Sequence, residues 1–80
     1  MTIPDRVDAR WIATLGDSQL VKAEAHLHKA FRVQEKAEKA RSGARYMLLQ
    51  GPPMLVNAYL QWLLVSDAAR TRGLVVHHSL

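Results

Sequence analysis

Apolar side chains recur every three or four positions along most of this chain, which is the spacing of a helix face rather than of a strand. No stretch of useful length alternates apolar and polar residues. The pattern predicts helices over residues 4–14, 18–49 and 53–72. Pro4 suits the first turn of the first helix, and Gly73 follows the third. We therefore expect an all-α protein with three helices.

The central helix carries the longest regular pattern, with three- and four-residue steps like those of a coiled-coil seam. The seam positions are Leu20, Ala23, Leu27, Ala30, Gln34, Ala37, Arg41, Ala44 and Leu48. The alanines among them would let a neighbouring helix approach closely. Gly43 is a weak point, because glycine inside a helix costs about 1 kcal/mol relative to alanine. We expect one helix to about Leu49, since the seam resumes in phase, but a break at Gly43 stays open.

Helix lengths suggest an arrangement for this single domain of residues 1–80. At a rise of about 1.5 Å per residue, the central helix would span about 48 Å, and the two shorter helices together would match it. We therefore expect helix 4–14 to pack antiparallel along its N-terminal half and helix 53–72 along its C-terminal half. Residues 74–80 would form an extended or flexible tail. A chain this short has a thin stability margin, so completion of a helical bundle by oligomerisation is expected.

The third helix is apolar on two sides. One stripe runs along its whole length and consists of Leu55, Ala58, Trp62, Val65 and Ala69. A second stripe consists of Val56, Tyr59, Leu60 and Leu63. A helix with two apolar sides is normally buried on both. We expect the longer stripe to be the intramolecular seam and the second stripe to contact another copy or another protein. Coverage of the second stripe by helix 4–14 or by the tail is the alternative.

The positive charge is concentrated in the central helix. The net charge is +4, and residues 22–45 hold seven Lys or Arg and three Glu. Five cations fall within a sector of about 100° opposite the seam. These are Lys22, Lys29, Arg32, Lys36 and Lys39. Such a basic stripe is typical of a protein that contacts the phosphate backbone of DNA or RNA. A solvated face with ordinary ion pairs, such as Glu35 with Lys39, is the alternative.

Several other classes of function have little support in the sequence. The chain has no cysteine, and His26 and His28 diverge by about 160° on a helix, so we expect no metal site. There is no glycine-rich phosphate loop and no nucleophile motif, so we expect neither catalysis nor a cofactor. The apolar run of residues 54–65 is shorter than the roughly 20 residues of a membrane span. Asp5 and Asp8 interrupt any secretory leader, so we expect a cytoplasmic protein without a membrane partner.

Two functions follow as hypotheses. In the first, the protein is a homodimer that associates through helix 53–72 and contacts nucleic acid through the basic face of helix 18–49. In the second, it is an adaptor or inhibitor that uses helix 53–72 to bind another protein, and its charge serves solubility or an acidic protein partner.

Overall fold

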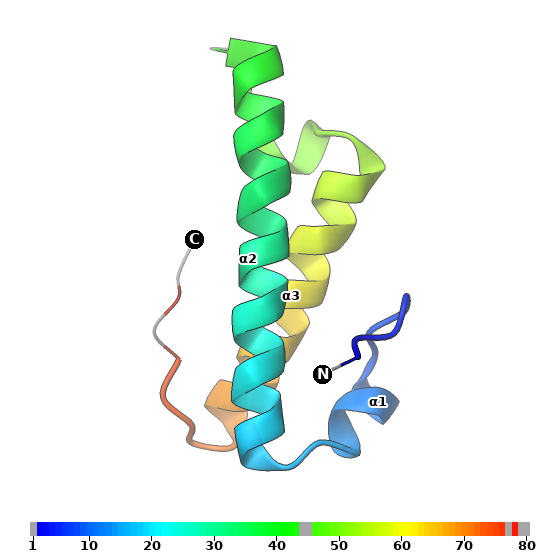
Figure 1. The fold of residues 1–80 in the computed structure, drawn as a ribbon, viewed down its shortest axis with the longest axis vertical. Coiled ribbons are helices and arrows are strands. Elements are labelled where there is room, and N and C mark those ends of the chain that lie inside the picture. Colours follow the sequence, from blue (N-terminus) through cyan, green and yellow to red (C-terminus); the bar gives the residue numbers. More distant parts are fainter. Residues whose placement is uncertain (1, 44–45, 77, 79–80) are drawn as a thin grey trace.

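The computed structural model describes residues 2–43, 46–76 and 78, and within these ranges the protein is entirely helical, without a strand. Its elements are α1 (Ala9–Ala13), α2 (Asp17–Ser42), the 3-10 helix η2 (Leu48–Gln50) and α3 (Pro53–Thr71). Figure 1 shows α2 and α3 as two long antiparallel neighbours, with the short α1 near the end at which α2 begins. The all-α prediction is confirmed, and α3 ends one residue before its predicted bound.

The first helix is shorter than predicted. The Asp8 backbone is extended, and its carboxylate accepts a hydrogen bond from the backbone N–H of Trp11 at 2.9 Å. Asp8 is therefore the N-cap of α1, because a cap residue leaves the helical conformation and satisfies a first-turn donor. The prediction of a helix from residue 4 is wrong. Residues 2–8 form an irregular segment instead, from which Val7 is buried in the core.

The central helix ends at Gly43, so the predicted continuation to Leu49 is also wrong. Gly43 caps α2 with a φ of 58°. Glycine adopts this conformation readily because it has no Cβ. Beyond the break, the predicted seam position Leu48 belongs to η2, whereas Ala44 lies outside the described residues.

The buried face of α2 follows the 3.6-residue repeat of a straight helix instead of the predicted heptad. A heptad seam drifts by about 20° per seven residues around a straight α-helix. The two patterns therefore agree at Leu20 and Leu27 but separate afterwards, so that Ala30 and Ala37 are exposed while Phe31 is buried. The buried residues of α2 are Leu20, Ala23, Glu24, Leu27, Phe31, Glu35 and Glu38.

α3 runs along α2 from the start of α2 to beyond Phe31, so it occupies the N-terminal half of α2 that length matching had assigned to the first helix. The indole N–H of Trp62 donates to Glu24 at 3.4 Å. Arg72, just after α3, donates to the carbonyl oxygens of Leu15 at 2.8 Å and Ile12 at 3.1 Å. The end of α3 therefore lies beside the start of α2. α1 packs against α3 and does not lie along α2 as a third long layer.

The core lies between α2 and α3 and is closed at one end by α1 and the segment before it. Phe31 and Trp62 stack with ring centroids 5.6 Å apart and an interplanar angle of 6°. Tyr59 is tilted against Phe31 at 5.4 Å. The predicted intramolecular seam of α3 is buried at Leu55, Trp62, Val65 and Ala69, and partly buried at Ala58.

The chain beyond α3 turns back beside α2. Gly73 has a φ of 79°, and the backbone N–H of Leu74 donates to the Ala69 carbonyl at 3.0 Å. This is a Schellman motif, in which a left-handed glycine ends a helix. Leu74 and Val76 are partly buried against the core and have no regular secondary structure. Residues 77, 79 and 80 of the predicted tail lie outside the described residues.

Candidate functional site

The side of α2 that faces away from α3 carries three of the five predicted cations. Lys22, Lys29 and Lys36 are all exposed. They are seven residues apart, so successive Cα atoms are separated by about 10 Å along the axis and fall within about 40° around it. Among the described residues, no ion pair includes any of these lysines. We call this row the lysine line.

Carboxylates are segregated from the lysine line. Glu24, Glu35 and Glu38 belong to the buried face of α2, which lies about 180° around the helix from the lysines. Each is neutralised or hydrogen-bonded there by a neighbouring side chain. The positive potential of the lysine line is therefore not cancelled by acidic side chains on the same face of α2.

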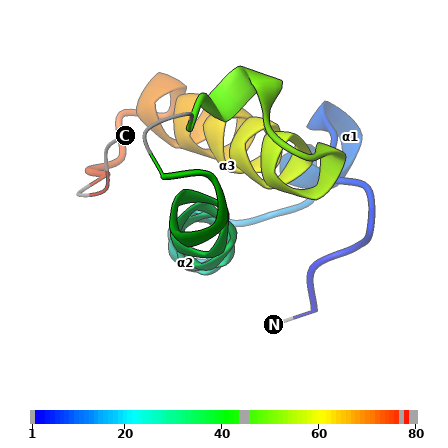
Figure 2. The same cartoon turned by 90° about the horizontal axis from the view of Figure 1, so that it is seen from above.

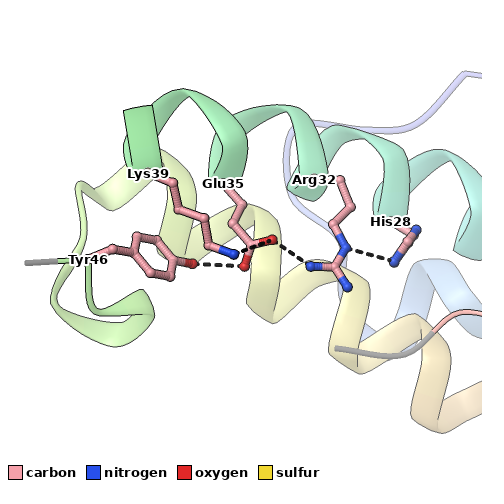
Figure 3. A network of polar contacts seen from close by, with 5 residues as sticks. All are labelled: His28, Arg32, Glu35, Lys39 and Tyr46. Carbon is pink, nitrogen blue, oxygen red and sulfur yellow. Dashed lines mark hydrogen bonds and ion pairs between the residues drawn. The ribbon is translucent and has the colours of Figure 1, made fainter. Parts of the chain in front are cut away.

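The other two predicted cations, Arg32 and Lys39, belong to a polar network at the edge of the buried face (Figure 3). Arg32 Nη1 lies 2.5 Å and Lys39 Nζ 3.8 Å from Glu35 Oε1. The Tyr46 hydroxyl donates to the second oxygen of Glu35 at 2.9 Å. Arg32 Nε also lies 3.4 Å from Nε2 of His28. The predicted basic stripe thus separates into three solvent-facing lysines and two cations that hold a carboxylate.

The network keeps Glu35 ionised and Tyr46 neutral. Burial would raise the pKa of the Glu35 carboxyl, but hydrogen bonds from Arg32 and Tyr46 and the charges of Arg32 and Lys39 outweigh it. The pKa of Glu35 therefore lies below its ordinary value. Burial and then the bond to Glu35 raise the pKa of Tyr46 to about 12. Tyr46 lies after the break that ends α2. Its hydrogen bond to Glu35 therefore attaches the segment between α2 and α3 to the side of α2.

A second buried carboxylate anchors the C-terminal tail. Glu24 is 3% exposed and contacts Nδ1 of His78, whose distance to Oε2 is 2.9 Å. The His28 and His78 rings stack at 4.3 Å, and His28 is tilted against Trp62 at 5.1 Å. The sequence pattern did not predict these contacts. The sequence feature that could have indicated a buried carboxylate is Trp62, because a buried indole N–H requires a hydrogen-bond acceptor.

The second stripe of α3 is only partly exposed. Tyr59 is half-buried against Phe31, and Val56 and Leu63 are also half-buried. Leu60 is 48% exposed, and Leu64, which sequence reasoning left out, is 40% exposed. We call the accessible apolar side chains Val56, Leu60, Leu63 and Leu64 the outer apolar face of α3. Leu60 and Leu64 lie on the side of the helix opposite its buried residues, and Val56 and Leu63 lie beside them.

Exposed apolar side chains also gather around the connection between α2 and α3. Met47 is 57% exposed, and Leu49 and Met54 are each 69% exposed. They belong to the segment that leads into η2, to η2 itself and to the first turn of α3. Apolar clusters of this kind are typical of contact surfaces for other molecules.

The described residues enclose no pocket, and no three potential metal ligands among them converge. No helix in this part of the chain is long and apolar enough to cross a membrane. Comparisons with models of protein families, with curated proteins and with solved structures find no match to this chain. The functional argument therefore rests on the lysine line, on the outer apolar face of α3 and on the exposed apolar side chains around the connection between α2 and α3.

Proposed function

We propose that this protein is a small non-enzymatic helical module that contacts the phosphate backbone of nucleic acid through the lysine line of α2 and pairs with a second copy through the outer apolar face of α3. The observation that carries the proposal is the lysine line itself. Lys22, Lys29 and Lys36 are exposed, aligned and free of carboxylates on their own face. Neutralising phosphates with such side chains releases condensed counterions, and this release drives binding.

Backbone contact is the mode of binding that suits these side chains. Ala25, Val33 and Ala40 are exposed on the same side of α2 as the lysines. None of them can form the bidentate hydrogen bonds with base edges by which proteins read sequence. Lysine contacts with phosphates position a protein without selecting a sequence. The proposal is therefore for binding that depends on charge and is indifferent to base sequence.

Fluorescence anisotropy with labelled duplex DNA and RNA, titrated at several salt concentrations, tests this proposal. With three phosphates neutralised, log K against log salt should have a slope of about −2.7. The triple variant Lys22→Gln, Lys29→Gln, Lys36→Gln should lose binding. The control is Arg6→Gln, Arg10→Gln, Arg70→Gln, which removes three exposed cations elsewhere. Equal weakening by both variants, or no binding by the wild type at low salt, would contradict the proposal.

A second candidate is an adaptor or inhibitor that binds another protein. The exposed apolar side chains Met47, Leu49 and Met54 favour it, because they lie outside both the core and the outer apolar face of α3. Under this alternative, the wild type ignores nucleic acid at low salt. The variant Met47→Ser, Leu49→Ser, Met54→Ser should then improve the solubility of the isolated chain, while the lysine-line variant leaves it unchanged.

A further inference from the structure

The two proposed contact surfaces point in opposite directions. α2 and α3 form two layers when seen along the molecule's long axis (Figure 2). The lysine line lies on the side of α2 away from α3, about 180° from the buried face. Leu60 and Leu64 lie on the side of α3 away from α2, also about 180° from its buried residues. A partner on one surface therefore leaves the other surface accessible.

The outer apolar face of α3 has a pattern that fits a second copy of itself. In an antiparallel pair of α3 helices centred on Leu60, positions equally far before and after Leu60 lie opposite each other. Leu60 then meets its own counterpart, and Val56, four residues before, meets Leu64, four residues after. Both contacts join exposed or half-buried apolar side chains, as a two-fold interface requires.

Electrostatics support the same register. Asp67, seven residues after Leu60, comes opposite Pro53, the first residue of the other α3. That helix start has no acidic residue in its first turn and no side-chain cap. A carboxylate near a helix N-terminus is favourable because of the partial positive charge there. The pairing also keeps the two lysine lines apart, since each lies on the far side of its own α2.

We infer that two copies pair antiparallel through α3 about Leu60, and that the resulting dimer bridges two nucleic-acid duplexes. The layers of such a dimer run α2, α3, α3, α2. With about 8–10 Å between neighbouring helices, the two α2 axes are about 24–30 Å apart. The lysine lines face outward in opposite directions, so one straight duplex cannot contact both. This bridging rests on the proposed function, because it requires each lysine line to bind a duplex.

Disulfide trapping tests the register, because the chain contains no cysteine. Leu60→Cys should form a covalent dimer under mild oxidation, since position 60 meets itself across the two-fold axis. Met54→Cys is the matched control, because Met54 is even more exposed, at 69%. Two copies of position 54 would lie about 18 Å apart along the axes in this register. Equal trapping at both positions, or none at position 60, would overturn the register.

Bridging is then measured with one duplex on beads and a second, fluorescent duplex in solution. The oxidised Leu60→Cys dimer should capture the second duplex, and excess protein should abolish capture because every duplex then carries its own dimers. Leu60→Glu should bind a single duplex in the anisotropy assay but capture at least tenfold less of the second. Covalent dimers that bind one duplex without capturing another would overturn bridging alone. Absence of any duplex binding would overturn the proposed function as well.

Discussion

At the scale of single residues, the unusual feature is the burial of three glutamates on one face of α2. An ionised carboxylate in such a place needs partners, because removing charge from water costs several kcal/mol when it is uncompensated. Glu35 obtains them from Arg32, Lys39 and Tyr46, which join two parts of the chain separated by the break after Gly43. Arg32 and Lys39, the cations nearest to the buried face, therefore stabilise the fold, whereas the lysine line faces solvent.

Removing the Tyr46 hydroxyl should therefore weaken the fold measurably. Tyr46→Phe leaves one oxygen of Glu35 without its donor, and a hydrogen bond to a charged group contributes roughly 1.5–3 kcal/mol. We expect a loss of about 1–2 kcal/mol in the free energy of unfolding by urea, because the site is partly solvated. Tyr59→Phe is the control, since no hydrogen bond among the described residues involves its hydroxyl. Equal effects of the two variants would contradict this role for the network.

The same network predicts how stability depends on pH. The pKa of Glu35 is lower in the folded state than its ordinary value of 4.5, so the unfolded chain binds the proton more readily. The ionised carboxylate of Glu35 therefore stabilises the folded state above its ordinary pKa, and this stabilisation is lost as pH falls through the pKa of the folded state. Tyr46 behaves oppositely, because its pKa rises from 10.0 to about 12, and its contribution is lost as pH rises through this range. As pH is lowered into the acid range, the urea midpoint of Glu35→Gln should fall less steeply than that of the wild type. As pH is raised into the alkaline range, the urea midpoint of Tyr46→Phe should fall less steeply than that of the wild type.

At the scale of elements, the bounds of α3, the end of α1 and the start of α2 could be predicted to within one residue, but the start of α1 and the end of α2 could not. α3 begins after Pro52 and ends at a left-handed glycine, and both signals are local. Two signals conflict at the end of α2, because Gly43 favours a break in the helix whereas the seam pattern continues in the sequence beyond it. The heptad pattern did not indicate the break, because α2 packs on α3 as a straight helix whose buried face includes Phe31. The missed role of Glu35 has the same origin, since Tyr46 reaches it only after the break.

The substitution Gly43→Ala tests whether α2 must end at residue 43 or can continue as the uninterrupted helix that the heptad pattern predicted. A Cβ at this position would meet no atom within 4 Å, so the cost of Gly43→Ala is that of the left-handed backbone alone. We expect a loss of about 1–2 kcal/mol in unfolding free energy. Gly16→Ala is the control, because Gly16 has a φ of −71° and its Cβ would make only an ordinary contact. An increase in stability and helicity on Gly43→Ala would instead mean that α2 continues readily beyond residue 43.

At the scale of the whole molecule, what matters is the direction in which each surface faces. The periodicity of the sequence predicted that Lys22, Lys29 and Lys36 lie opposite the buried face of α2. It also predicted a second apolar stripe on α3. It did not predict that Phe31 would partly cover that stripe at Tyr59, and it left out Leu64, which is exposed together with Leu60. The contact of Tyr59 with Phe31 joins segments far apart in the chain, which periodicity within one helix does not contain. The place of Leu64 beside Leu60 follows from the helix repeat, because the two residues are four positions apart.

The distinction between the two sides of α3 leads to the last prediction. Leu55 is fully buried, and a glutamate there would place an unpaired charge in the core, so Leu55→Glu should unfold the chain. Leu60 is 48% exposed, so Leu60→Glu should keep the helical circular dichroism spectrum of the wild type. It should nevertheless shift the sedimentation coefficient from dimer to monomer, because two like charges would meet at the two-fold axis. A wild type that sediments as a folded monomer at micromolar concentration would contradict self-association. In that case each chain would bind one duplex through its lysine line and would not bridge two duplexes.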